Sequence, residues 1–166
     1  PAQMGLLMTS FLLAYGVANL VLAPLGRVMG PRKAMSLAIV VWSVAVAAGG
    51  WVGSFSAMLA CRVVLGIGEG LHWPMQSAFV KNWFPLGERS RANSAWLLGI
   101  MVGPLLAMPL LTSVVVTQGW RACFWVLAVC SVIPLFLVWW GTSDTPEQDA
   151  RVNQLELDYI PVSYTH

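Results

Sequence analysis

Two charged side chains, Arg62 and Glu69, lie inside a segment that is otherwise apolar and long enough to cross a lipid bilayer. As a helix, this segment (Ala57–Val80) would extend for about 36 Å, whereas the hydrocarbon core of a bilayer is roughly 30 Å thick. An ionised side chain near the middle of that core costs roughly 2.5 kcal/mol or more. Membrane segments keep such residues where they have partners, face water or take part in function. The two residues therefore indicate either a transport pathway or an ion pair between helices.

The spacing of the polar residues places them on one face of a helix. Arg62, Glu69 and Gln76 follow one another at intervals of seven and so form a single polar stripe. Because helical side chains lean toward the N-terminus, Arg62 points away from Glu69. We expect each of the two to find its partner on another helix or in a shared aqueous cavity. His72 lies close enough to Glu69 in sequence to relay protons, although an isolated histidine is more often a hydrogen-bonded spectator.

The backbone next to Glu69 is predicted to be interrupted. Glycines occupy positions 66, 68 and 70, and Pro74 lacks the N–H that would bond to the carbonyl of Gly70. Broken backbone inside a membrane is tolerated only where it lines protein or water. The pattern predicts a hydrated segment in which the Glu69 carboxyl couples proton binding to transport. The alternative is a fixed ion pair that only holds the helices together.

The elements that must position these residues are membrane-spanning helices. Hydrophobic residues make up 58% of the chain and charged residues 10%, whereas soluble domains contain roughly 25% charged residues. All candidate spans but one lack charged residues, which excludes a soluble bundle, because each of its helices would need a polar face. The predicted fold class is an all-α multi-pass membrane protein, with spans at Met4–Leu25, Ala34–Val52, Ala57–Val80, Ala92–Val116 and Ala122–Trp140.

Basic residues alternate between the loops, and this alternation predicts the orientation. The loops after the first and third spans hold the basic residues Arg27, Arg32, Lys33, Lys81, Arg89 and Arg91. The second loop carries no charge, and the fourth carries only Arg121. The positive-inside rule places the first and third loops on the cytoplasmic side of a cell (inner) membrane. The chain start is then outside and the tail is cytoplasmic. The basic excess belongs to these loops, so no nucleic-acid partner is implied.

Several motifs together resemble one transporter superfamily. The run Arg62-Val-Val-Leu-Gly66-Ile-Gly68-Glu69-Gly70 is similar to the Arg-x-x-x-Gly-x-Gly signature of the fourth helix in the major facilitator superfamily. A second set resembles its anion:cation symporter family, which includes carriers of galactonate, glucarate, tartrate and sialic acid: Trp73-Pro74, Trp83-Phe84-Pro85, Glu88-Arg89-Ser90-Arg91-Ala92 and Gly119-Trp120-Arg121 with Phe124. The resemblance implies that the five spans are helices two to six of twelve, from the N-terminal six-helix half.

The loop between the first two spans resembles the cytoplasmic signature of the same superfamily, Gly-x-x-x-Asp-Arg-x-Gly-x-Arg-Arg/Lys. Arg27, Gly30, Arg32 and Lys33 match it, whereas Gly26 stands at the aspartate. In the family, that aspartate helps to latch the two halves in the outward-open state. The resemblance therefore implies a gating loop whose latch is in doubt. The basic residues are also explained by a cytoplasmic location alone, and both roles can hold at once.

Two polar residues on the first span lie one turn apart. The resemblance implies that Tyr15 faces the substrate cavity. Asn19 could share that role, but an interhelical hydrogen bond also explains it.

The fourth span carries the glycine pair Gly99-x-x-x-Gly103, which partly resembles an antiporter signature without its closing glycines. We interpret Gly99 and Gly103 as helix-packing positions, together with Gly66 and Gly68, because small residues at this spacing let helices approach closely. This interpretation favours symport over antiport only weakly.

The predicted function is proton-coupled symport of a small organic anion, a sugar acid or another carboxylate, by alternating access between two six-helix halves. Arg62 would attract the carboxylate, and Glu69 would take up and release the coupling proton. The alternatives are an anion exchanger and a non-transporting, receptor-like or assembly protein on a transporter fold, for which Gly26 is the one hint. An enzyme is not expected, because no nucleophile–base pair or paired metal ligands are found, and no metal or cofactor other than the proton is predicted.

We expect the chain to be a piece of a longer protein. It begins with Pro1 rather than Met, three residues before a span. Residues 1–143 are predicted to form a partial N-terminal transmembrane bundle and residues 144–166 the start of a cytoplasmic central loop. We interpret the last six residues, Pro161–His166, as an artificial or sequencing remnant. The expected partners are the organic anion, the lipid bilayer, the first helix and the C-terminal half.

Overall fold

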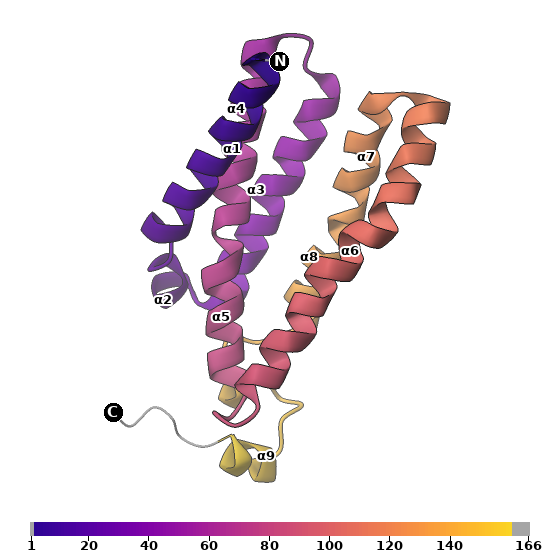
Figure 1. Ribbon diagram of the computed structural model, residues 1–166. Coiled ribbons are helices and arrows are strands. Elements are labelled where there is room, and N and C mark those ends of the chain that lie inside the picture. The colour runs from indigo at the N-terminus through magenta and orange to yellow at the C-terminus, as the bar shows by residue number, and fades with distance from the viewer. Residues whose placement is uncertain (1, 161–166) are drawn as a thin grey trace.

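Helices make up nearly all of the computed structural model, which describes residues 2–160 (Figure 1). Five stretches are long and apolar enough to cross a membrane: α1 (Ala2–Val21), α3 (Pro31–Trp51), α4 (Phe55–Gly70) continued by α5 (His72–Trp83), α6 (Arg89–Gln118), and α7 (Trp120–Cys130) continued by α8 (Val132–Gly141). The short elements are α2 (Leu25–Met29), the 3-10 helix η1 (Pro146–Gln148) and α9 (Gln154–Tyr159). The prediction about Pro161–His166 lies outside the described residues.

The turn between α1 and α3 follows from its prolines and one glycine. α1 ends at Val21, four residues before the predicted end of the first span, because the ring of Pro24 excludes a continuous helix there. Pro31 opens α3, a position at which proline costs no hydrogen bond. Gly30, between α2 and α3, has φ +82° and ψ 149°, a conformation that is essentially restricted to glycine. The cytoplasmic signature of the sequence is therefore a compact turn followed by a helix N-terminus.

Glycines let α4 pack between α1 and α3 at backbone distance. A Cβ atom at Gly66 would lie 2.5 Å from the Phe11 carbonyl oxygen, and one at Gly70 would lie 2.5 Å from the Tyr15 carbonyl oxygen, both on α1. On the opposite side, a Cβ atom at Gly68 would lie 2.9 Å from a backbone nitrogen of α3. The alternating glycines thus serve two neighbouring helices, and any larger side chain would force them apart.

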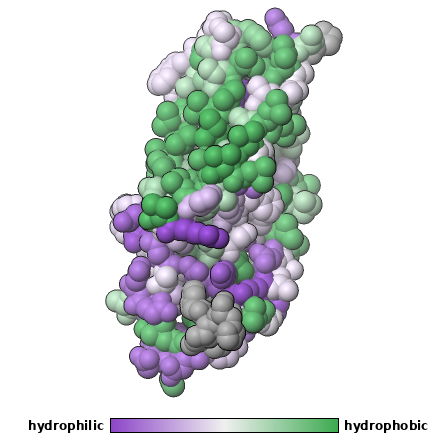
Figure 2. All heavy atoms as spheres, turned by 90° about the vertical axis from the view of Figure 1, so that its left-hand side faces the viewer, coloured by the Kyte–Doolittle hydropathy of each residue, from purple (hydrophilic) through white to green (hydrophobic). Residues whose placement is uncertain are grey.

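The buried core is small and lies between α3 and the α4–α5 junction, where it contains Ala34, Met35, Ala38, Ile39, Leu71 and Met75. α1, α6 and the α7–α8 pair leave most of their apolar side chains exposed. The side on which α1 and α2 lie shows a band of hydrophobic residues above a hydrophilic end (Figure 2). This is the distribution expected when the exposed apolar surface faces lipid or further helices.

Candidate functional site

The α4–α5 helix pair is interrupted at Leu71, directly after Glu69 and Gly70. α4 ends at Gly70, Leu71 has φ −74° and ψ −20°, and α5 begins at His72 with Pro74 in its first turn. The interruption predicted from Pro74 is therefore present. It places Glu69 at the last turn of α4, where helical hydrogen bonding is incomplete.

Arg62 and Glu69 are both half-buried on α4 and do not pair directly. Within residues 2–160 neither forms an ion pair, although the carboxylate remains within electrostatic reach of the guanidinium. This agrees with the side-chain directions, which point Arg62 away from Glu69. The partner expected on another helix is not found among the described residues. Neither charge is therefore neutralised by an ion pair among residues 2–160.

Tyr15 is brought from α1 to the junction of α4 and α5. Tyr15 lies close enough to the Trp73 side chain on α5 and to the Glu69 carboxyl on α4 to interact with both. The ring centroids of Phe11 and Tyr15 are 6.0 Å apart. The side chain of Asn19, one turn later, makes no hydrogen bond to any described residue, so the interhelical bond proposed as its alternative role is not seen. The structure therefore groups Tyr15, but not Asn19, with the charged residues.

His72 is held between two tryptophans from other helices. Its ring centroid is 5.7 Å from that of Trp42 on α3 and 5.5 Å from that of Trp96 on α6. The Trp96 ring also meets Trp73 edge to face, at 4.4 Å. His72 Nδ1 is buried and has no hydrogen-bond partner in the part of the chain that the structure describes. His72 therefore belongs to an aromatic cluster and retains one unused polar atom.

A cavity of about 670 Å³ lies beside this cluster, between α3, α5, α6 and α8, and includes Trp42, His72, Gln76, Trp96 and Val138 in its lining. Gln76 is buried, and its Nε2 donates a 3.1 Å hydrogen bond to Asn93 Oδ1 at the start of α6. Arg62, Glu69 and Tyr15 do not line this cavity. The predicted site residues thus fall into two groups, which Trp73 connects through its contacts with Tyr15 and Trp96.

At the helix ends that carry the basic loops, which we call the cytoplasmic ends after their predicted orientation, the first turn of α3 binds the segment after α8. The backbone N–H of Arg32 donates a 2.7 Å hydrogen bond to Asp144 Oδ1. The Arg32 guanidinium donates to the Trp139 carbonyl and lies 5.0 Å from the centroid of the Trp139 ring. A Cβ atom at Gly30 would lie 2.5–2.7 Å from the Asp144 carboxyl atoms, so only glycine leaves room for this carboxylate.

The same segment also binds the end of α5. Trp83 Nε1 donates to the Ser143 carbonyl at 3.1 Å, and Asn82 Nδ2 donates to the Asp144 carbonyl at 2.9 Å. Three helix ends, those of α3, α5 and α8, therefore meet at Ser143 and Asp144. We call this set of contacts the cytoplasmic brace: Arg32, Asn82, Trp83, Trp139, Ser143 and Asp144.

Of the predicted gating-loop residues, Gly30 and Arg32 belong to the cytoplasmic brace, whereas Gly26, Arg27 and Lys33 do not. A Cβ atom at Gly26 would lie 2.6 Å from the Met75 thioether, so Gly26 packs against α5. Arg27 and Lys33 are exposed, and their side chains form no hydrogen bond or ion pair with any residue between 2 and 160. The residues of the loop signature therefore have different surroundings. Gly30 and Arg32 contact the segment after α8, Gly26 packs against α5, and Arg27 and Lys33 form an exposed basic surface.

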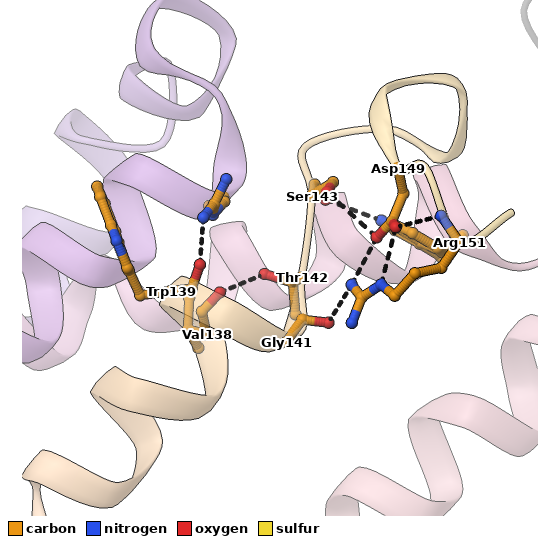
Figure 3. Close-up of polar contacts among 9 residues, drawn as sticks. Val138, Trp139, Gly141, Thr142, Ser143, Asp149 and Arg151 are labelled. Atoms are coloured by element: carbon orange, nitrogen blue, oxygen red, sulfur yellow. Dashed lines mark hydrogen bonds and ion pairs between the residues drawn. The ribbon is translucent and has the colours of Figure 1, made fainter.

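The chain after α8 folds back against the loop between α5 and α6. Arg151 forms a 2.6 Å ion pair with the buried Asp149 carboxylate and donates to the Gly141 carbonyl (Figure 3). The side-chain hydrogen bonds from Arg151 hold the pKa of Asp149 well below its ordinary value. Tyr159 on α9 donates to Glu88 Oε1 at 2.9 Å, and this bond raises the pKa of the Tyr159 hydroxyl. These contacts hold the start of the segment that is predicted to be cytoplasmic.

None of the five described membrane helices packs closely against Gly99 or Gly103. A Cβ atom added at either glycine would have no described atom of another element within 4 Å. Their packing role stays a prediction. Sequence reasoning missed the partners that form the aromatic cluster, the hydrogen bond of Gln76 and the cytoplasmic brace: Trp42, Trp96, Asn93, Asn82 and Asp144. For Asp144 a signal existed, because a carboxylate that follows one helix is attracted to the N-terminus of a neighbouring helix.

Comparisons with known proteins agree on one family. A family model described as Major Facilitator Superfamily matches residues 1–163. The chain is 29% identical over 165 residues to a probable sulfoacetate transporter, SauU, of Cupriavidus necator, covering 99% of this chain and 38% of that protein. It is 33% identical over 134 residues to a probable L-galactonate transporter of Escherichia coli K12, covering 78% of this chain and 29% of that protein.

The fold agrees with a solved transporter structure. A bacterial homologue of the human lysosomal transporter Spinster, in an inward-facing and unoccupied conformation, matches with a TM-score of 0.75 at 22% identity. The match covers 89% of this chain and 36% of the solved chain. The chain thus spans about a third of the length of these proteins and has the helical architecture predicted for it.

Proposed function

Because the chain belongs to the major facilitator superfamily, we propose that the full-length protein is a secondary transporter of small organic anions. The matched relatives are named as transporters, in keeping with the prediction that the protein is not an enzyme. These relatives, a probable sulfoacetate transporter and a probable L-galactonate transporter, support small organic anions as the substrate class. The protein would lie in the cell (inner) membrane, with the cytoplasmic brace on the inner side, as the basic loops favour.

The observation that carries the proposal is that Arg62 and Glu69, on one interrupted membrane helix, form no ion pair with any residue between 2 and 160. A cation without a carboxylate partner can hold the carboxylate of a substrate, because charge-assisted hydrogen bonds are strong away from water. A carboxyl group without a basic partner can bind and release a proton as the pathway opens to either side. We propose proton-coupled symport by alternating access, with Arg62 binding the anion and Glu69 binding the proton.

Tyr15 and Trp73 support these roles by position. Tyr15 comes from α1 and Trp73 from α5, and Tyr15 lies close enough to interact with both Trp73 and Glu69. Substrate binding that moves Tyr15 would change the surroundings of Glu69. We therefore propose Tyr15 as the residue that connects the anion site with the proton site, whereas His72 and Gln76 line the separate cavity.

The test uses the full-length protein in proteoliposomes, with sugar acids and sulfonated acids as substrates. Uptake driven by a pH gradient and exchange without a gradient are measured for wild type, Glu69→Gln and, as a matched control, Glu88→Gln at the cytoplasmic surface. We expect Glu69→Gln to lose at least tenfold in accumulation while retaining exchange, and Glu88→Gln to accumulate normally.

Three results contradict the proposal. Accumulation by Glu69→Gln at the wild-type level would show that the coupling proton binds elsewhere. Exchange without accumulation by the wild-type protein would identify an anion exchanger. No movement of any anion by a correctly folded wild-type protein would favour a non-transporting role for this fold.

A further inference from the structure

An apolar groove lies on one side of the seam between α1 and α4. It measures about 560 Å³, and apart from Ser10 its lining side chains are apolar, including Leu13, Val17, Val63 and Ile67. Leu13 and Val17 remain about 60% exposed (64% and 59%), so the groove is open along its length. Its shape and chemistry suit a hydrocarbon chain, and it ends at Val21 and Leu22 at the cytoplasmic end of α1.

A second cleft, of about 440 Å³, begins at the next residue, Ala23, between α2 and α5. Its lining includes Arg27, Ser77 and Lys81. Ile67, Pro74, Ala78 and Lys81 recur at helical spacing along α4 and α5, so one face of this helix pair lines both clefts. The two clefts therefore follow one another along one face of this helix pair, and we call the two together the groove. It is apolar along α1 and α4 and cationic between α2 and α5.

The cationic end of the groove has no counter-ion within the described chain. Arg27 and Lys81 are its only charged lining residues, and both are exposed. Among residues 2–160 the one ion pair joins Asp149 with Arg151, so neither Arg27 nor Lys81 is neutralised by a carboxylate. Gly26 contributes no side chain to the cleft, and the Ser77 hydroxyl is exposed beside it. The cleft thus offers two cations and one hydroxyl to an external anion.

The position of the cations relative to the hydrophobic surface identifies the source of that anion. Figure 2 views the side of the molecule on which α1 and α2 lie, and there hydrophilic residues gather directly below the hydrophobic band. Arg27 lies on the short helix α2 (Leu25–Met29), a few residues after Leu22, where the apolar lining ends. Cations at this level meet lipid headgroups, and basic pockets between membrane helices on the cytoplasmic side bind anionic headgroups.

We propose that this groove holds one anionic phospholipid, with its phosphate between Arg27 and Lys81 and an acyl chain against Leu13, Val17 and Ile67. The phosphate accepts hydrogen bonds from the two cations and from the Ser77 hydroxyl. The acyl chain covers the apolar side chains that line the groove between α1 and α4. Because the groove lies along the α1–α4 seam, the bound lipid stabilises the helix pair that carries Tyr15 and Glu69.

The test measures lipid binding to the full-length protein by native mass spectrometry, with phosphatidylglycerol as the anionic probe and phosphatidylcholine as the neutral one. Each basic side chain near an anionic headgroup contributes roughly fivefold to binding, so Arg27→Gln/Lys81→Gln should weaken phosphatidylglycerol binding about 30-fold. The matched control, Lys33→Gln/Arg91→Gln, removes the same charge from exposed cytoplasmic positions outside the groove and should change binding by less than about threefold. Val17→Trp fills the apolar part and should weaken binding of both lipids.

Each of the following results overturns the proposal. Equal phosphatidylglycerol binding by wild type and Arg27→Gln/Lys81→Gln would show that the cations do not hold the headgroup. An equal loss in the control would show diffuse attraction to the basic face. Displacement of the lipid by millimolar inorganic phosphate would identify a site for a free anion. No effect of Val17→Trp would show that another part of the protein covers the groove.

Discussion

Substitution of Gly30 is the most direct test of how the cytoplasmic ends of the helices are held together. The change Gly30→Ala adds a methyl group 2.5–2.7 Å from the Asp144 carboxyl atoms, in a backbone conformation with φ +82°. The methyl group must displace the carboxylate, which then loses the 2.7 Å hydrogen bond from the Arg32 backbone N–H. The perturbation therefore combines backbone strain with the loss of one tertiary contact.

The two contributions can be estimated separately. A non-glycine residue in this backbone region costs about 1–3 kcal/mol. A hydrogen bond to a charged group contributes about 1.5–3 kcal/mol. Gly30→Ala should therefore lower the free energy of unfolding by about 4 kcal/mol. Gly119→Ala should cost only about 2 kcal/mol, because Gly119 has a similar conformation, with φ +85°, but no atom within 4 Å of a built Cβ.

The assay is equilibrium unfolding of the full-length protein in mixed micelles titrated with SDS. The difference between Gly30→Ala and Gly119→Ala, about 2 kcal/mol, is the part assigned to Asp144. In an Asp144→Ala background this difference should disappear, because the carboxylate is already absent. If Gly30→Ala is no more costly than Gly119→Ala, or if the effects of Gly30→Ala and Asp144→Ala simply add, the contact of Asp144 with α3 is not a stabilising one.

Three further predictions concern helix packing, a buried amide and the cytoplasmic segment. Gly66→Leu should destabilise the protein by about 3 kcal/mol in the same assay by forcing α1 and α4 apart, whereas Gly16→Leu, at an open position on α1, should cost less than about 1 kcal/mol. Gln76→Ala should cost about 1 kcal/mol, because it removes the hydrogen bond between α5 and α6; wild-type stability would count against that bond. Because Arg151 lowers the pKa of Asp149, their contact should contribute fully above about pH 4 and be lost only as the pH falls toward the lowered pKa. Hydrogen exchange of residues 149–156 between pH 7 and pH 3 measures this, and a loss of protection near pH 6 would contradict it.

Much of this architecture could be predicted from the sequence because the signals are local. Long apolar segments interrupted by basic loops identify membrane helices without any knowledge of their neighbours. Pro74 removes a backbone donor wherever its helix lies, so the break at Leu71 was predictable. The seven-residue spacing of Arg62 and Glu69 places them on one face of the helix but two turns apart. This too follows from local helix geometry alone.

Only the tertiary structure decided which of these residues meet. The contact between Arg32 and Asp144 joins positions 112 residues apart, and the aromatic cluster around His72 takes one tryptophan from α3 and another from α6. No local pattern specifies such pairs, because they depend on how helix ends and faces are brought together by packing. Gly26 and Gly30 illustrate the difference: the same loop signature holds both, yet one packs against Met75 and the other makes room for a carboxylate. The sequence by itself determined the membrane class, the spans and the broken helix, while the packing of α3 against α5 and α8 decided the contacts at their cytoplasmic ends.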